Sequence, residues 1–72
     1  MSPSGERIRN QIRELRFHHG EMTQQHLADQ IGVTRQTVNA IEGGKYSPSL
    51  EVAFKIAYVF GKPLEEVFQF DT

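Results

Sequence analysis

The sequence predicts an all-α fold, a compact bundle of five short helices. Apolar residues recur at spacings of three and four, serines or threonines that can start a helix precede these runs, and glycines or prolines separate them. A chain of 72 residues has room for one domain. We place that domain at residues 6–72, after a loose lead of Ser, Pro and Gly at residues 1–5.

The first helix is expected over residues 6–18. Ile8, Ile12 and Leu15 are four and three positions apart, so they would lie on one side of this helix and face inward. The helix should end before Gly20, because glycine favours the end of a helix.

Residues 23–42 contain two short helical patterns that meet at Gly32. Glycine at this point can adopt the left-handed conformation that ends the first of them. Thr23 and Thr34 can each accept a backbone N–H as N-caps, and Ala28 is small where two helices crossing at roughly 90–120° come closest. The apolar residues that would pack the pair together are Leu27, Ile31, Val33, Val38 and Ile41. The segment is therefore predicted to be a helix-turn-helix.

The C-terminal part should hold two further helices and a short strand. One helix is expected between Ser49, which can cap it, and Gly61, and another is expected after Pro63. The first of these carries more apolar residues than one inward stripe requires, so a second buried face is implied. Phe68-Gln69-Phe70-Asp71 alternates with the period of a strand. Residues 50–72 are therefore the predicted dimerisation region, with Phe54, Tyr58, Val67, Phe68 and Phe70 at the subunit contact.

Short motifs along most of the chain resemble the Cro and phage-repressor class of helix-turn-helix regulators, also called XRE-type. Residues 23–42 contain Thr-Gln, Leu-Ala, Gly-Val-Thr and Ile-Glu in the order of that class, and Gly-Lys follows. Similar stretches are Ile12-Arg13-Glu14-Leu15-Arg16, Gly44-Lys45-Tyr46-Ser47-Pro48-Ser49-Leu50 and Pro63-Leu64-Glu65-Glu66-Val67-Phe68. The resemblance implies a lambda-repressor-like DNA-binding domain.

The resemblance also implies which residues would contact bases. In this class the second helix of the motif enters the major groove with its first turn toward the base edges. Arg35 could donate to guanine O6 and N7, Gln36 could pair with adenine N6 and N7, and Ala40 could touch a thymine methyl group. Asn39 is a further candidate, and Thr37 suits a phosphate or a water. Without the resemblance, these residues would equally suit a solvated helix face.

Phosphate contacts are expected on both sides of this helix. Thr23 and Gln24 lie at a helix start, where free N–H groups attract an anion. Thr34, Lys45 and Tyr46 match further positions that grip the DNA backbone in the class. For Tyr46, packing against the protein is an equal alternative.

Other positions concern stability. Arg16 and Glu42 match an arginine and a glutamate that form an ion pair in the class, and the alternative is two separate surface charges. Three residues depart from the class: Glu21 is one residue more than usual, His26 replaces a glutamate of the capping box, and Gly43 replaces an asparagine or lysine.

Charge and composition bound the function. The net charge is −1, with six basic and five acidic residues up to Lys45 and two basic and four acidic residues after it, so any positive surface must be local. The chain has no cysteine, and the spacing of His18, His19 and His26 does not favour a metal site. No Ser-His-Asp spacing indicates a nucleophile, so we expect neither an enzyme nor a cofactor.

These observations predict a DNA-binding transcriptional regulator. The expected form is a homodimer that represses from a palindromic operator, with two recognition helices about 34 Å apart on double-stranded DNA. Without an apolar run long enough for a membrane or a secretory signal, it is expected in the cytoplasm. The alternative is an antitoxin-like or adaptor module that binds a protein partner, which the slight acidity favours.

Overall fold

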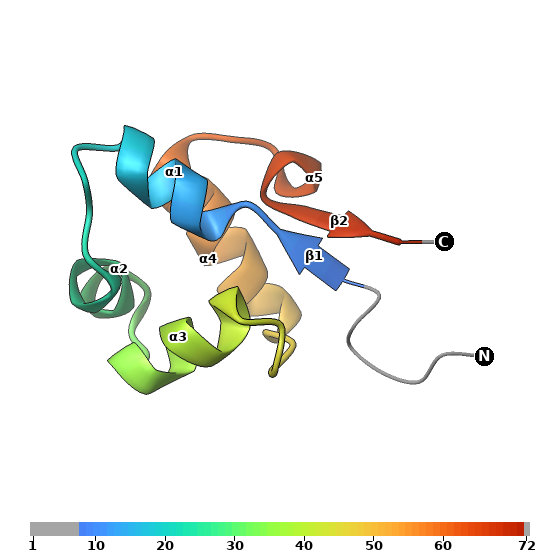
Figure 1. Ribbon diagram of the computed structural model, residues 1–72, viewed down its shortest axis with the longest axis horizontal. Helices are drawn as coiled ribbons and strands as arrows, with labels where there is room; N and C mark the ends of the chain where they lie inside the picture. Colours follow the sequence, from blue (N-terminus) through green and yellow to red (C-terminus); the bar gives the residue numbers. More distant parts are fainter. Residues whose placement is uncertain (1–7, 72) are drawn as a thin grey trace.

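The computed structural model describes residues 8–71. Its elements are β1 (Ile8–Asn10), α1 (Ile12–His18), α2 (Gln24–Ile31), α3 (Arg35–Glu42), α4 (Leu50–Phe60), α5 (Leu64–Val67) and β2 (Phe68–Phe70) (Figure 1). The five helices confirm the predicted fold class, and the short C-terminal strand is present. The loose lead predicted at residues 1–5 lies outside the described residues.

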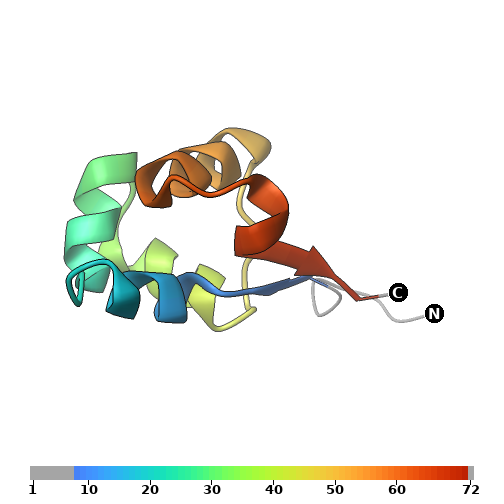
Figure 2. The ribbon, with the colours of Figure 1, turned by 90° about the horizontal axis from the view of Figure 1, so that it is seen from above.

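The start of the predicted first helix is wrong, because residues 8–10 form a strand and α1 begins at Ile12. β1 pairs antiparallel with β2, with Ile8 opposite Phe70 and Asn10 opposite Phe68. Asn10 Oδ1 accepts the N–H of Ile12 at 3.1 Å, so asparagine stands where the helix begins. Ile8, expected to face inward, is 36% exposed. The small sheet projects from one end of the helical body (Figures 1 and 2).

The two helices of the motif form as the sequence predicts. Gly32 has φ +79° and donates its N–H to the carbonyl of Ala28 at 2.8 Å, which ends α2. Thr23 caps α2 and Thr34 caps α3, each accepting the N–H of the residue three positions later at 3.0 and 3.1 Å. Buried side chains along the pair are Leu27, Ala28, Ile31, Val38 and Ile41. The predicted turn, caps and apolar contacts are confirmed.

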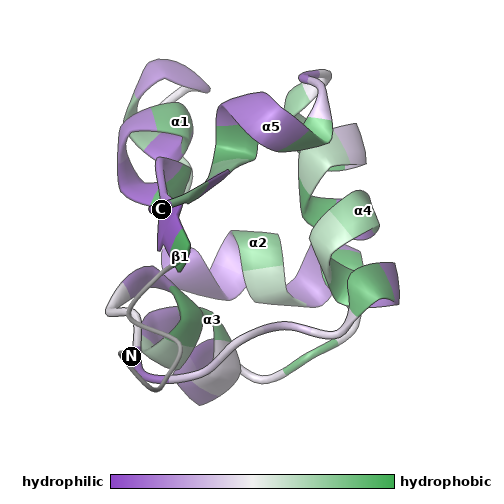
Figure 3. Cartoon of the chain, turned by 90° about the vertical axis from the view of Figure 1, so that its right-hand side faces the viewer, coloured by the Kyte–Doolittle hydropathy of each residue, from purple (hydrophilic) through white to green (hydrophobic). Residues whose placement is uncertain are grey.

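The fourth helix has two apolar sides. Ser49 caps it by accepting the N–H of Val52 at 3.2 Å, and Gly61 ends it at φ +65°. Its inward side chains are Ala53, Ile56, Ala57 and Phe60, while Leu50, Phe54 and Tyr58 point outward. Figure 3 shows α4 as hydrophobic along most of its length. The second apolar face inferred from the sequence is therefore present and exposed in the single chain.

Val67 was predicted at a subunit contact, and the structure corrects this. The side chain is fully buried in the core of its own chain, and the carbonyl of Val67 accepts the N–H of Gln11 at 2.9 Å. The single turn of α5 brings Val67 inward, whereas Phe68 is partly buried and Phe70 is 63% exposed. Across residues 8–71, no helix is long and apolar enough to cross a membrane.

Candidate nucleic-acid interface

The first turns of α3 present a polar surface. Arg35, Gln36 and Asn39 are exposed, and Thr37 and Ala40 are partly buried beside them. Arg35 has no ion pair with any residue in the described range 8–71. Val38 and Ile41, on the opposite side of the helix, are buried in the core. The helix therefore fixes a polar face toward solvent by burying its apolar face.

The start of α3 carries a pair of hydroxyl groups. Thr34 Oγ1 accepts the N–H of Thr37 and lies 2.9 Å from Thr37 Oγ1, so one hydroxyl donates to the other. Each hydroxyl has a single hydrogen, so one hydrogen of the pair stays available for an external acceptor. This site can donate to a phosphate oxygen or to a base, next to the exposed Arg35.

Gln24 links the start of α2 to α3. Its amide nitrogen donates to Asn39 Oδ1 and to Glu42 Oε1, both at 3.2 Å. These two bonds use both amide hydrogens of the side chain, so the phosphate contact predicted for Gln24 would come from its backbone N–H at the start of α2. Gln24 thereby positions Asn39. The amide hydrogens of Asn39 and the second lone pair of its carbonyl oxygen stay available outward.

An ion pair anchors the C-terminal end of α3 to α1. Arg16 donates from Nε to Glu42 Oε2 at 2.6 Å and from Nη2 to Glu42 Oε1 at 3.0 Å. A third bond runs from Arg16 Nη1 to the carbonyl of Met22 at 2.7 Å. The side chains of Arg16 and Glu42 are only 15% and 9% exposed. This bidentate ion pair and the bond to Met22 connect three parts of the chain: α1, α3 and the loop that precedes α2.

The remaining phosphate candidates lie around α3. Thr23 is exposed at the start of α2, and Lys45 is exposed in the loop after α3. The N–H of Lys45 donates to the carbonyl of Ala40 at 2.9 Å, which fixes the backbone at this point. Tyr46 is 55% exposed and also lines a small hollow beside Ile8, so it combines partial packing with an accessible ring.

The structure has the arrangement of a helix-turn-helix. A tight turn at Gly32 precedes α3, Thr34 caps its start, and the ion pair of Glu42 with Arg16 fixes its end. The family model described as Helix-turn-helix matches residues 12–67. The chain belongs to this family, in its XRE-type branch of transcriptional regulators, as the resemblance to Cro and phage repressors predicted.

Relatives from several organisms share most of the chain. An uncharacterized HTH-type transcriptional regulator of Archaeoglobus fulgidus is 50% identical over 64 residues, covering 89% of this chain and 90% of its own. One from Methanocaldococcus jannaschii is 47% identical, covering 89% and 96%. The CTXphi transcriptional repressor RstR of Vibrio cholerae is 38% identical over 81% of this chain and 51% of its own. A crystal structure from Bacteroides fragilis, 22% identical, has a TM-score of 0.74 over 86% of this chain and 98% of its own, which supports the fold.

Sequence reasoning missed the internal role of Gln24. The sequence offers one indication, which is that Gln24 directly follows the cap Thr23. A side chain at the first position of α2 can extend toward the second helix of the motif. Its two acceptors are 15 and 18 residues away, so the bonds depend on how α2 and α3 cross.

Proposed function

We propose that this protein is a sequence-specific repressor of transcription that binds double-stranded DNA as a homodimer on a palindromic operator. The observation that carries the proposal is the exposed polar first half of α3, fixed at its start by Thr34 and at its end by Glu42. A rigid helix of this kind can insert into the major groove without reorganising.

Base recognition is assigned to the exposed side chains of α3. Arg35 offers a guanidinium with free donors for guanine, and Gln36 offers an amide that can pair with adenine. Asn39 contributes an amide that the bond from Gln24 to its carbonyl oxygen holds in place. Thr37 shares its hydroxyl with Thr34, and Ala40 can meet only an apolar group.

Phosphate contacts are assigned to groups around the helix. Thr23, Thr34 and Tyr46 supply hydroxyls, and Lys45 supplies a cation without an ion-pair partner in residues 8–71. Such contacts set register and orientation on the duplex but carry no sequence information.

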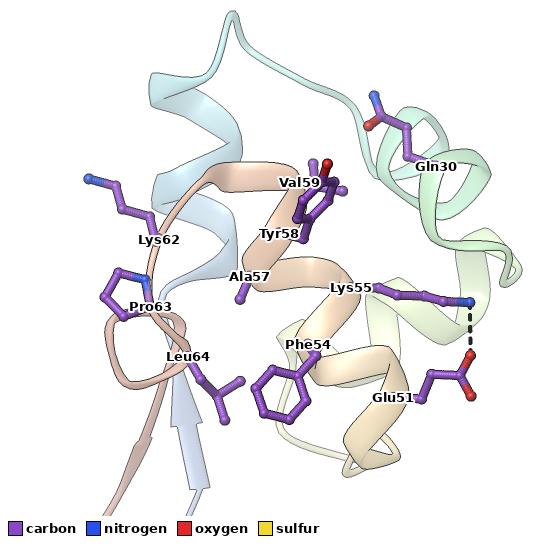
Figure 4. A pocket seen from close by; sticks show the side chains of 10 residues that line it. All are labelled: Gln30, Glu51, Phe54, Lys55, Ala57, Tyr58, Val59, Lys62, Pro63 and Leu64. Carbon is purple, nitrogen blue, oxygen red and sulfur yellow. Dashed lines mark ion pairs between the residues drawn. The ribbon is translucent and has the colours of Figure 1, made fainter.

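A second copy of the chain is the proposed occupant of the outer face of α4. Leu50, Phe54 and Tyr58 are spaced by four and are 69%, 54% and 87% exposed, which forms a ridge that can pack against the same ridge of a partner. An open groove of about 760 Å³ lies beside this ridge, and Phe54 and Leu64 extend toward each other across it (Figure 4). The exposed Phe70 and the partly buried Phe68 add apolar surface at the sheet.

Repression and a cytoplasmic location complete the proposal. The Vibrio cholerae relative is named a transcriptional repressor, and a dimer on an operator can block polymerase without any further domain. The competing proposal is an antitoxin-like or adaptor module, which the same apolar groove would serve by binding a different protein.

A selection from random duplexes separates these functions. The protein is incubated with a library of random duplexes at two salt concentrations, and the bound sequences are determined. We expect enriched palindromes, with half-sites about one helical turn apart and an affinity that falls as salt increases. Absence of enrichment at both salt concentrations would overturn the regulator and favour the adaptor.

A further inference from the structure

A polar groove of about 530 Å³ lies between α1 and α3. Its charged and amide-bearing side chains are Arg13, Arg16, Gln24, Asn39, Glu42 and Lys45. In Figure 1 the first turn of α1 lies above the last turn of α3. The residues that line the groove come from these two helices, from Gln24 at the start of α2 and from the loop after α3. The groove is therefore continuous with the proposed base-reading surface through Asn39.

The groove is positive although the whole chain is negative. It contains the cations Arg13, Arg16 and Lys45 and one anion, Glu42, so its charge is +3 − 1 = +2, against a net charge of −1 for the chain. Glu42 is matched by Arg16, which binds both of its carboxylate oxygens. The two charges without an ion-pair partner among residues 8–71 belong to Arg13 and Lys45.

Arg13 is exposed and makes no side-chain contact of the hydrogen-bonding or ion-pair kind within residues 8–71. Its sequence neighbour Glu14 lines a different hollow, together with Arg9. Within the described part of the chain, Arg13 and Lys45 are therefore two cations without a partner on the same groove. Such a pair suits a singly charged anion with two exposed oxygens.

We propose that this groove binds a phosphodiester of the DNA backbone, with Arg13 on one side and Lys45 on the other. This rests on the proposed function, and it adds α1 to the DNA-binding surface. A free phosphate ion has the same chemistry, but only the duplex also places bases against Asn39 and Arg35. Arg13 would thus contact the DNA backbone directly, so it contributes affinity and no sequence preference.

The test compares Arg13→Gln with Arg9→Gln in the full chain. Arg9 is exposed on β1, lines a different hollow and pairs with the exposed Asp71 at 2.7 Å, so both variants remove one exposed positive charge. Affinity for a selected duplex and for a scrambled duplex is measured by fluorescence anisotropy over a salt series. One control titration adds inorganic phosphate alone at constant ionic strength.

We expect Arg13→Gln to weaken binding to both duplexes by the same factor and to lower the salt slope by about 1, as the loss of one phosphate contact requires. Arg13→Lys should restore the slope, and Arg9→Gln should match the wild type. Equal slopes for Arg13→Gln and the wild type would overturn the groove assignment alone. Displacement of DNA by low inorganic phosphate would favour a free-anion site instead, and failure of the wild type to bind any duplex would overturn the proposed function as well.

Discussion

Two sides of the molecule differ in what they expose to solvent. The side built from α2 and α3 is polar, and the side built from α4 is apolar. On the first, buried side chains hold a helix whose outer face is polar, and internal hydrogen bonds fix the functional groups of Asn39 and Glu42. On the second, Phe54 and Tyr58 leave more than half of their surface in solvent, and no element of residues 8–71 covers them.

This difference indicates two kinds of partner. A fixed polar surface suits a hydrated, negatively charged duplex when it carries cations such as Arg35 and Lys45, which have no ion-pair partner among residues 8–71. An exposed apolar ridge gains free energy when another apolar surface covers it. Assigning DNA to one side and a second copy to the other lets a small chain bind DNA as a dimer.

The largest expected effect concerns the ion pair that anchors α3. Glu42→Ala leaves Arg16 without its partner in a site that is nearly closed to water, which should cost about 3 kcal/mol of unfolding free energy. For a domain of this size the melting temperature should fall by at least about 10 °C, measured by circular dichroism. Glu51→Ala removes an exposed pair with Lys55 and should change stability by less than about 0.5 kcal/mol. Equal melting temperatures for the two variants would show that the anchor contributes nothing.

The next effect concerns the apolar ridge. Phe54→Ser should weaken the dimer by roughly 2 kcal/mol, as the loss of a central aromatic contact does, while the fold of each chain is retained. Sedimentation equilibrium gives the dissociation constant. Phe17→Ser is the matched control, because Phe17 is also exposed, at 63%, but lies on α1. If both variants dissociate alike, or the wild type is a monomer, α4 is not the subunit contact.

A smaller, more selective effect is expected on the polar side. Arg35→Ala should cost about 1–3 kcal/mol at one base pair of each half-site and relax the preference there, because the guanidinium is assigned to a base edge. Lys45→Ala should weaken all duplexes by a similar factor. Preference profiles from competition binding check both variants. An unchanged profile for Arg35→Ala would remove this residue from base reading.

The sequence predicts those features that depend on residues close together in the chain, and it misses those that depend on distant ones. Thr23, Thr34 and Gly32 act within one turn of a helix, so their residue types were enough to place the motif. The strand at Ile8 was missed, because its partner Phe70 lies at the other end of the chain and the spacing of Ile8 and Ile12 also fits a helix.

The candidate site divides in the same way. The exposed face of α3 follows from helical periodicity, which places Arg35 and Gln36 opposite buried residues. The bonds from Gln24 and the groove around Arg13 depend on how separate helices cross, which periodicity within one helix does not specify.

Methylation interference is the most decisive test of whether α3 reads base edges in the major groove. A selected duplex that contains guanine in each half-site is treated lightly with dimethyl sulfate, which modifies guanine N7 in the major groove and adenine N3 in the minor groove. We expect guanine methylation in both half-sites to block binding and adenine methylation to have no effect. Interference from adenine alone, or from neither base, would contradict the claim.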